Sequence, residues 1–267
     1  ALRVAANRYE IPLDDWLDLS TGINPQGWPV PAVPATVWRR LPGDEDGLES
    51  AATAYYGTAS LLPVAGTQAA IQALPLIRDP GRVGVPHPSY AEHEHAWRRA
   101  GHRVERLAVE HLDAAVAGLD VLVLVQPNNP TGVRFSQESL LDWRARLAER
   151  GGWLVVDEAF VDATPTDSLA GQVGLPGLIV LRSLGKFFGL AGARVGFVLA
   201  EPTVLERLRE PLGPWTVSGP SRWVATQALA DRAWQDRTRV ELGRAGTRLA
   251  DLLRRQRLPV AGGGVLF

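Results

Sequence analysis

Seven short strand-like segments alternate with helical patterns along this chain, and this alternation restricts the possible folds more than any other feature. The segments are rich in Val, Leu and Ile and occupy residues 61–64, 82–86, 104–108, 121–125, 153–156, 178–181 and 195–199. Short apolar runs of this kind are typical of strands that are buried on both faces. Strands that alternate with helices favour a parallel sheet covered by helices. The sequence therefore predicts an α/β fold with a mostly parallel sheet sandwiched by helices.

The helical patterns fall between and after these segments. Apolar spacing and breakers such as Gly57 predict helices over residues 1–8, 44–57, 91–101, 112–118, 137–150 and 202–210, and another helix after Gly66. Residues 221–257 are expected to form one long helical region with an amphipathic face. Residues 16–19 are predicted as a short strand in a Pro-rich N-terminal arm, in which Trp28 and Trp38 are expected to be exposed.

Composition excludes several classes of protein. The chain has 267 residues, a net charge of −1 and a sequence pI near 6.6, so it has no basic footprint for nucleic acid or for an anionic membrane surface. It has no cysteine, which removes disulfides, thiolate metal sites and a Cys nucleophile. We predict no metal site. No apolar stretch is long enough to span a bilayer and no signal peptide opens the sequence, so a cytoplasmic location is expected.

The ends of the sequence indicate that residues are missing from both. The chain contains no Met, not even an initiator, and it stops at Gly-Gly-Gly-Val-Leu-Phe, where we expect a turn followed by the start of a strand. Any site residue beyond Phe267 is therefore outside the sequence.

One lysine stands out. Of the 28 Lys and Arg residues only Lys186 is a lysine, and it lies in a Gly-containing loop between two apolar segments. Arg can replace Lys in ion pairs and anion sites, but only the primary amine forms Schiff bases with carbonyl compounds. A lysine left by chance on the surface is the alternative.

Several residues near strand ends could bind an anion beside this amine. Gly66, Thr67 and Gln68 lie between a strand and a helix, where free N–H groups and the helix dipole favour negative charge. The hydroxyl of Ser183 and the guanidinium of Arg194 flank Lys186 in sequence. An ordinary helix cap and an ordinary ion pair remain the alternatives.

Three more polar residues follow strands. Tyr90 precedes a helix and could stack on a ligand, although such a Tyr is more often core or surface. Asn129 lies in the Asn-, Pro- and Gly-rich loop after 121–125, and Asp157 directly follows the segment 153–156. Ligands gather at the carboxyl ends of strands in open α/β sheets. A carboxylate at the end of a buried strand requires a cationic partner or a function.

Taken in chain order, Gly66-Thr67-Gln68, Asn129-Pro130-Thr131-Gly132, Asp157-Glu158-Ala159, and Ser183-Leu184-Gly185-Lys186 with Arg194 resemble the fold-type-I pyridoxal-phosphate enzymes of the aminotransferase class I/II superfamily. The resemblance covers nearly the whole chain. It implies the cofactor pyridoxal 5'-phosphate (PLP), a homodimer, and a second, smaller α/β domain built from the chain ends. The implied divisions are an N-terminal arm with part of the small domain (1–43), a large PLP-binding domain (44–205), and a linking helix with the start of the C-terminal small domain (206–267).

The resemblance also assigns roles. Lys186 would hold PLP covalently and move protons, Asp157 would pair with the ring nitrogen, Asn129 would bind the ring 3-oxygen and Tyr90 would stack on the ring. The phosphate would be bound by the remaining members of the set, Gly66, Thr67, Gln68, Ser183 and Arg194. Three positions depart from the common pattern: Phe160 replaces a Tyr, Gly185 a hydroxyl residue, and Leu41 a Tyr that reaches the neighbouring subunit.

Within the superfamily, residues 16–25 and 181–192 are most similar to the L-threonine-O-3-phosphate decarboxylases of cobalamin biosynthesis. This implies a small phosphorylated amino-acid substrate, bound in part by Gly22, Ile23, Asn24 and Asn129, and loss of CO₂ from it. The alternatives are a histidinol-phosphate-type aminotransferase and a non-catalytic PLP-binding module. Because decarboxylation and transamination share the same first step, the residues named here do not separate them.

Overall fold

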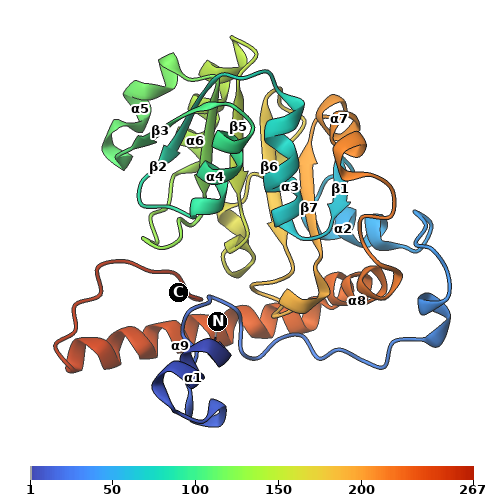
Figure 1. Ribbon diagram of the computed structural model, residues 1–267, viewed down its shortest axis with the longest axis vertical. Helices are drawn as coiled ribbons and strands as arrows, with labels where there is room; N and C mark the ends of the chain where they lie inside the picture. The colour runs from blue at the N-terminus through green and yellow to red at the C-terminus, as the bar shows by residue number, and fades with distance from the viewer. Residues whose placement is uncertain (1) are drawn as a thin grey trace.

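A seven-stranded sheet forms the centre of the structure, a computed structural model that describes residues 2–267 (Figure 1). Its order is β1-β7-β6-β5-β4-β2-β3, and only β7 runs antiparallel to its neighbours, so the predicted mostly parallel sheet is confirmed. The strands are β1 (Leu61–Val64), β2 (Arg82–Pro86), β3 (Arg103–Leu107), β4 (Val121–Val125), β5 (Trp153–Asp157), β6 (Leu178–Ser183) and β7 (Gly196–Ala200).

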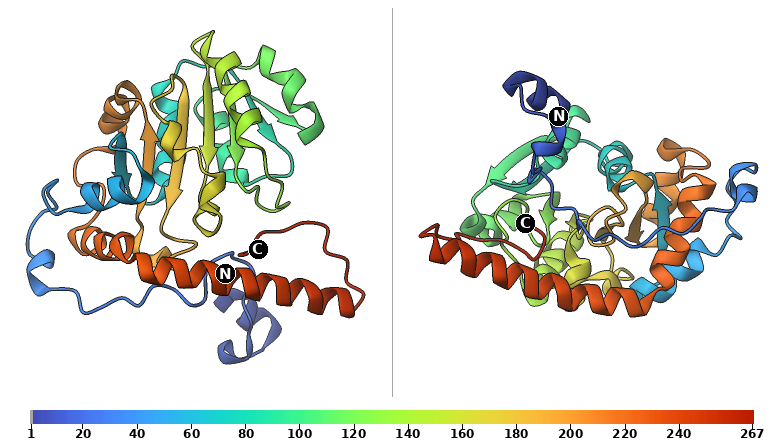
Figure 2. Two further views of the ribbon diagram at one scale, coloured as in Figure 1. Left: turned by 180° about the vertical axis from the view of Figure 1, so that it is seen from behind. Right: turned by 90° about the horizontal axis from the view of Figure 1, so that it is seen from below.

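Helices cover both faces of the sheet, as Figures 1 and 2 show. One core packs α3, α4 and α7 against one face, and the other packs α2, α5, α6 and α8 against the opposite face. The helices are α1 (Leu2–Tyr9), α2 (Leu48–Tyr56), α3 (Thr67–Ala73), α4 (Ala91–Arg99), α5 (Leu112–Ala115), α6 (Gln137–Ala148), α7 (Pro202–Leu212), α8 (Gly219–Ala230) and α9 (Arg232–Arg255). This is the predicted sandwich.

Alternation along the strands decides which residues face which helices. In β5, Leu154 and Val156 belong to the core under α2 and α6, whereas Trp153 and Val155 belong to the core under α3 and α4. Because successive side chains point to opposite faces, the next residue of β5 is directed toward α3 and α4. The same rule places neighbouring residues at the end of β6 on opposite sides of the sheet.

Three local predictions are wrong. The long helical region is two helices, because the side chain of Asp231 accepts a hydrogen bond from the Trp234 amide and so caps a new helix, α9. Residues 16–19 pair with no strand of the sheet. Trp28 is only 7% exposed because its indole donates to Asp231 and its ring packs in the core, whereas Trp38 is 68% exposed as expected.

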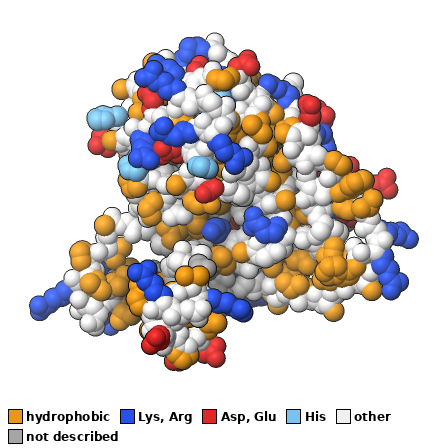
Figure 3. Space-filling model, viewed as in Figure 1, with side chains coloured by type: hydrophobic (Ala, Val, Ile, Leu, Met, Phe, Trp, Pro, Cys, Tyr) orange, Lys and Arg blue, Asp and Glu red, His pale blue; other side chains and the backbone are white. Residues whose placement is uncertain are grey.

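The N-terminal arm, α9 and the C-terminal tail lie beneath the lower edge of the sheet in Figure 1, where the parallel strands end. Arm and tail come together there, since a Cβ on Gly22 would lie 2.9 Å from the carbonyl oxygen of Leu266. Within residues 2–267 no helix has the length and apolarity needed to cross a membrane. Positive and negative side chains are interspersed on the face drawn in Figure 3.

Candidate active site

The carboxyl-terminal edge of the sheet brings most of the predicted residues together. Asn129 follows β4, Asp157 ends β5, and Lys186 follows β6. β1 is parallel to β6, because both run antiparallel to β7, so Gly66 emerges at this same edge. Polar groups from four strand ends therefore surround one region, which is where open α/β sheets bind ligands.

Lys186 lies in the loop between β6 and β7 and is half-buried. Its amine nitrogen is 5.1 Å from the centroid of the Phe160 ring. Burial lowers the pKa of Lys186, and the charge of Arg194 lowers it further, while Asp157 opposes both. The lowered pKa increases the neutral, nucleophilic fraction of the amine near neutral pH.

Asp157 is 3% exposed and has two partners. His93 of α4 approaches it with Nε2 at 2.9 Å from Oδ2, and the Ala159 amide donates to Oδ1 at 3.0 Å. An ionised carboxylate only accepts, so the Nε2–H of His93 is the donor. The arrangement orients the carboxylate and leaves it able to accept a further hydrogen bond from a protonated ring nitrogen.

Sequence reasoning missed His93. It lies on the buried face of α4, one turn before Trp97, and its side chain reaches the end of β5. A buried histidine four residues before a buried Trp was a visible signal, but only the fold shows that Asp157 is its partner.

Arg194 and Gly66 are in close contact. Gly66 has φ = 75°, and a Cβ placed on it would lie 2.5 Å from the Nη2 atom of Arg194, so only Gly leaves room for this guanidinium. Thr67 and Gln68 form the first turn of α3, whose N–H groups have no partner within the helix. A positive charge and free N–H groups thus face one spot, which suits a phosphate.

Ser183 and Gln68 use their side chains within the protein. The Ser183 hydroxyl accepts from the Gly185 amide at 3.1 Å and so shapes the start of the Lys186 loop. The Gln68 side chain donates to Glu92 at 2.8 Å, so the backbone N–H of Gln68 is the group that remains to bind an anion. Both residues lie where the phosphate site was predicted.

Tyr90 lies beside His93, with ring centroids 6.2 Å apart, and burial raises its pKa. Asn129 is half-buried, and no hydrogen bond of its side chain is found among the described residues. Its neighbour Asn128 is buried and bonded to Ser89, Pro88 and Thr131. Asn128 therefore holds the loop, and Asn129 is the asparagine available to a ligand.

The N-terminal arm docks onto the Lys186 loop. The Asn24 amide donates to the Lys186 carbonyl at 3.0 Å, and the Asn24 side chain donates to the Phe187 carbonyl at 3.0 Å. Its Oδ1 accepts from Gln26, so this side chain is engaged in holding the arm. Gly22 and Ile23 precede it, and a Cβ on Gly22 would lie 2.9 Å from the Phe160 ring. The arm thus forms one wall of the region around Lys186.

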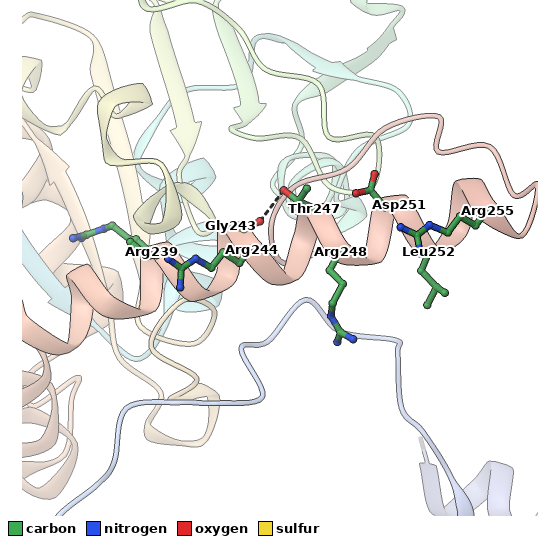
Figure 4. Close-up of a pocket in the computed structure, with 9 residues that line it drawn as sticks. Arg239, Gly243, Arg244, Thr247, Arg248, Asp251, Leu252 and Arg255 are labelled. Atoms are coloured by element: carbon green, nitrogen blue, oxygen red, sulfur yellow. Dashed lines mark hydrogen bonds between the residues drawn. The ribbon is translucent and has the colours of Figure 1, made fainter.

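A separate groove runs along α9 (Figure 4). Its volume is about 760 Å³, and it is lined by residues of α9 that include Arg239, Arg244, Arg248 and Arg255. None of the predicted cofactor residues lines it, so it is distinct from the candidate site.

The groups around Lys186 fit PLP. A buried carboxylate can pair with a pyridinium nitrogen, an amine of lowered pKa can bond to an aldehyde, and Arg194 with the start of α3 can bind a phosphate. The glycine at position 66 leaves the space that such a phosphate site requires.

Comparison with known proteins agrees with this geometry. The family described as aminotransferase class I and II matches residues 39–264. The chain is 59% identical to the threonine-phosphate decarboxylase of Pseudomonas aeruginosa over 266 residues, and the matched region covers all of this chain and 80% of that protein.

Solved structures with the same fold include a decarboxylase and an aminotransferase. The L-threonine-O-3-phosphate decarboxylase of Porphyromonas gingivalis has a TM-score of 0.71 at 22% identity, covering 82% of this chain and 73% of the other. The histidinol-phosphate aminotransferase of Sinorhizobium meliloti, in complex with pyridoxal-5'-phosphate, has a TM-score of 0.73 at 23% identity, covering 85% and 67%.

Proposed function

Because the chain belongs to the aminotransferase class I and II family, we propose that it is a PLP-dependent decarboxylase of L-threonine O-3-phosphate. The product would be (R)-1-amino-2-propanol O-2-phosphate, a precursor in cobalamin biosynthesis. The observation that carries the proposal is the 59% identity, over the full chain, to a threonine-phosphate decarboxylase. A second supporting observation is that the single lysine of the chain lies at the edge of the sheet where open α/β sheets bind ligands.

Each group around the site has a proposed role. Lys186 would bond to PLP, Asp157 would pair with its ring nitrogen, and Asn129 would bind its 3-oxygen. Tyr90 would lie on the ring face. The phosphate would be held by the groups that converge near the start of α3, namely Gly66, Thr67, Gln68, Ser183 and Arg194.

PLP, when bound, withdraws electrons from the bond that breaks at the substrate α-carbon. Asp157 would pair with the ring nitrogen of the bound cofactor, and His93 holds its carboxylate in one orientation. Lys186 carries the proton that replaces the lost carboxylate on the α-carbon. Phe160 beside the amine has no hydroxyl, which leaves one hydrogen-bond donor fewer near the cofactor than a Tyr would supply.

The substrate would lie between the arm and the Asn129 loop. Gly22 and Ile23 would line the approach with backbone groups, and the bonds of Asn24 to the Lys186 loop support their position. The bond between the α-carbon and the carboxylate of the substrate must stand perpendicular to the ring for CO₂ to leave, so the phosphate of the substrate would have to be anchored at a separate point. That anchor would orient the breaking bond.

The test uses two substrate sets. Protein loaded with PLP is incubated with L-threonine phosphate, and separately with histidinol phosphate and 2-oxoglutarate. The proposal expects CO₂ and aminopropanol phosphate from the first and no glutamate from the second, with Lys186→Ala as the inactive control. Glutamate from the second set without CO₂ from the first would replace the proposal with an aminotransferase.

We also propose that the protein acts as a homodimer in the cytoplasm, with the divisions 1–43, 44–205 and 206–267. The N-terminal arm carries large exposed apolar side chains, among them Leu17, Leu19, Trp38 and Leu41. Burying such groups would stabilise a second copy. Sedimentation equilibrium tests the dimer, and a fully active monomer would contradict it.

A further inference from the structure

A buried polar cluster lies on the side of the sheet opposite the candidate site. Asp157 is directed toward α4, but Glu158, the next residue, bonds on the other side, where α2 covers the sheet. In β6 the adjacent residues Ser183 and Arg182 likewise point to opposite sides of the sheet. The guanidinium of Arg182 lies 4.7 Å from the ring centroid of Tyr56 in α2. Two site residues therefore each have an immediate neighbour in this cluster.

Hydrogen bonds connect the cluster closely. Arg182 donates to Glu158 Oε2 at 2.9 Å and to Ser168 Oγ at 2.8 Å, and it also pairs with Asp162. Glu158 Oε1 accepts from the Leu169 amide at 2.7 Å. The Glu158, Asp162 and Arg182 side chains are between 0 and 3% exposed.

Stability alone does not explain such a cluster. Removing charges from water is costly, and well-packed apolar residues often stabilise a fold as well as a buried ion pair does. What the ion pair provides in addition is a fixed geometry, because a planar guanidinium bonded to two carboxylates allows little sliding.

The position of the pair determines what it fixes. Asp157 is in register with Leu181 across β5 and β6, and the Glu158 amide donates to the Leu181 carbonyl at 2.9 Å. The Glu158–Arg182 bond comes directly after these links, where β6 gives way to the loop that carries Lys186. It is thus the side-chain link between the two strand ends that carry the carboxylate and the amine.

We propose that Glu158 and Arg182 are positioning residues that hold the ends of β5 and β6 together and so set the separation of Asp157 from Lys186. The inference rests on the proposed function only in taking Asp157 and Lys186 as parts of its site. The side chains of Glu158 and Arg182 bond to each other on the side of the sheet opposite that of Asp157, so neither is expected to touch the ligand.

The test compares two Glu→Gln variants. Glu158→Gln removes the charge of one of the two carboxylates that bind Arg182. The control Glu49→Gln removes the charge of one of the two carboxylates that bind Arg222, a mostly buried arginine that bridges Glu49 and Asp46 away from the site. Ser168→Ala, which removes a hydroxyl bonded to both Glu158 and Arg182, is the milder variant should Glu158→Gln not fold.

The first readout needs neither cofactor nor substrate. Lys186 is the only lysine, so the rate at which trinitrobenzenesulfonate labels it in apoprotein can be followed by peptide mapping as a function of pH, and the midpoint of this profile reports its pKa. Moving Asp157 away weakens the attraction that raises this pKa, so the midpoint should shift to lower pH. The second readout is kcat in the holoenzyme, which should drop roughly tenfold or more with little change in KM.

Glu49→Gln should lower the melting temperature and leave the labelling midpoint and kcat unchanged. The proposal is overturned if Glu158→Gln, or Ser168→Ala in its place, also lowers the melting temperature only. If wild-type protein releases no CO₂ from threonine phosphate, the proposed function fails, but the labelling midpoints still decide this inference.

Discussion

The contact between Gly66 and Arg194 allows a quantitative test of the phosphate site. In Gly66→Ala the new Cβ would lie 2.5 Å from the Nη2 atom of Arg194, well inside contact distance. Arg194 is exposed and its side chain is flexible, so the guanidinium would move while the fold remains. The variant therefore displaces the proposed phosphate ligand without deleting it.

Gly213→Ala is a matched control. Gly213 has φ = 71° and ψ = 179°, close to the 75° and 159° of Gly66, but nothing lies within 4 Å of a Cβ placed on it. Ala in this backbone region costs about 1–3 kcal/mol at either position. Both variants should lose similar stability, and only Gly66→Ala should lose cofactor affinity.

The expected loss follows from one charge-assisted hydrogen bond, about 1.5–3 kcal/mol, which raises the Kd of PLP by roughly 10- to 150-fold. Titration of apoprotein with PLP and with pyridoxal, which has no phosphate, separates the phosphate contribution. The Kd of pyridoxal divided by the Kd of PLP should shrink by that factor in Gly66→Ala and stay at the wild-type value in Gly213→Ala. An unchanged ratio in Gly66→Ala would refute the assignment of Arg194 and Gly66 to the phosphate.

Three further predictions concern Lys186 and Asp157. Borohydride should fix PLP to Lys186 in the wild type, and Lys186→Ala should yield almost no reduced adduct anywhere in the chain, because no other lysine remains; as much reduced adduct in Lys186→Ala as in the wild type would contradict the role. Asp157→Asn keeps the shape but removes the charge, so kcat should fall by about two orders of magnitude or more, while unchanged turnover would reject the ring-nitrogen pairing. Because burial lowers the pKa of Lys186 from 10.5, the unfolded apoprotein binds more protons between the folded pKa and 10.5, so the free energy of unfolding should rise with pH across that window. Denaturant unfolding of wild type and Lys186→Met measures this, and equal pH slopes would show that Lys186 is not buried as described.

The strands and their polar ends were predictable because both depend on local sequence. Each β-branched, apolar run between breakers became a strand, with ends shifted by at most a few residues, as for β3 at Arg103–Leu107. Parallel strands end at one edge, so residues after different strands could be placed together without knowing the fold in detail. Lys186 was identified by composition alone, since it is the only primary amine of a side chain.

The errors and omissions arose where a distant partner decides the structure. Asp231 could have continued a helix, but its side chain caps α9 and also binds the Trp28 indole, an interaction across 203 residues that no local pattern contains. His93 was missed for the same reason, because its role depends on how α4 lies over the end of β5.

Asp157 and Glu158 show where such reasoning stops. In sequence they are two adjacent carboxylates at the end of an apolar strand, and either would serve a ring nitrogen. Alternation in β5 separates them: Val155 contacts the core under α3 and α4, so Asp157 faces that side, while Glu158 bonds to Arg182 on the other. The resemblance selected Asp157, and the structure supplies the physical reason: Glu158 is already neutralised by a buried arginine, whereas Asp157 is bonded by a histidine and one amide among residues 2–267. Exchanging the pair, as Asp157→Glu with Glu158→Asp, should therefore disturb the pairing with the ring nitrogen on one side of the sheet and the ion pair with Arg182 on the other.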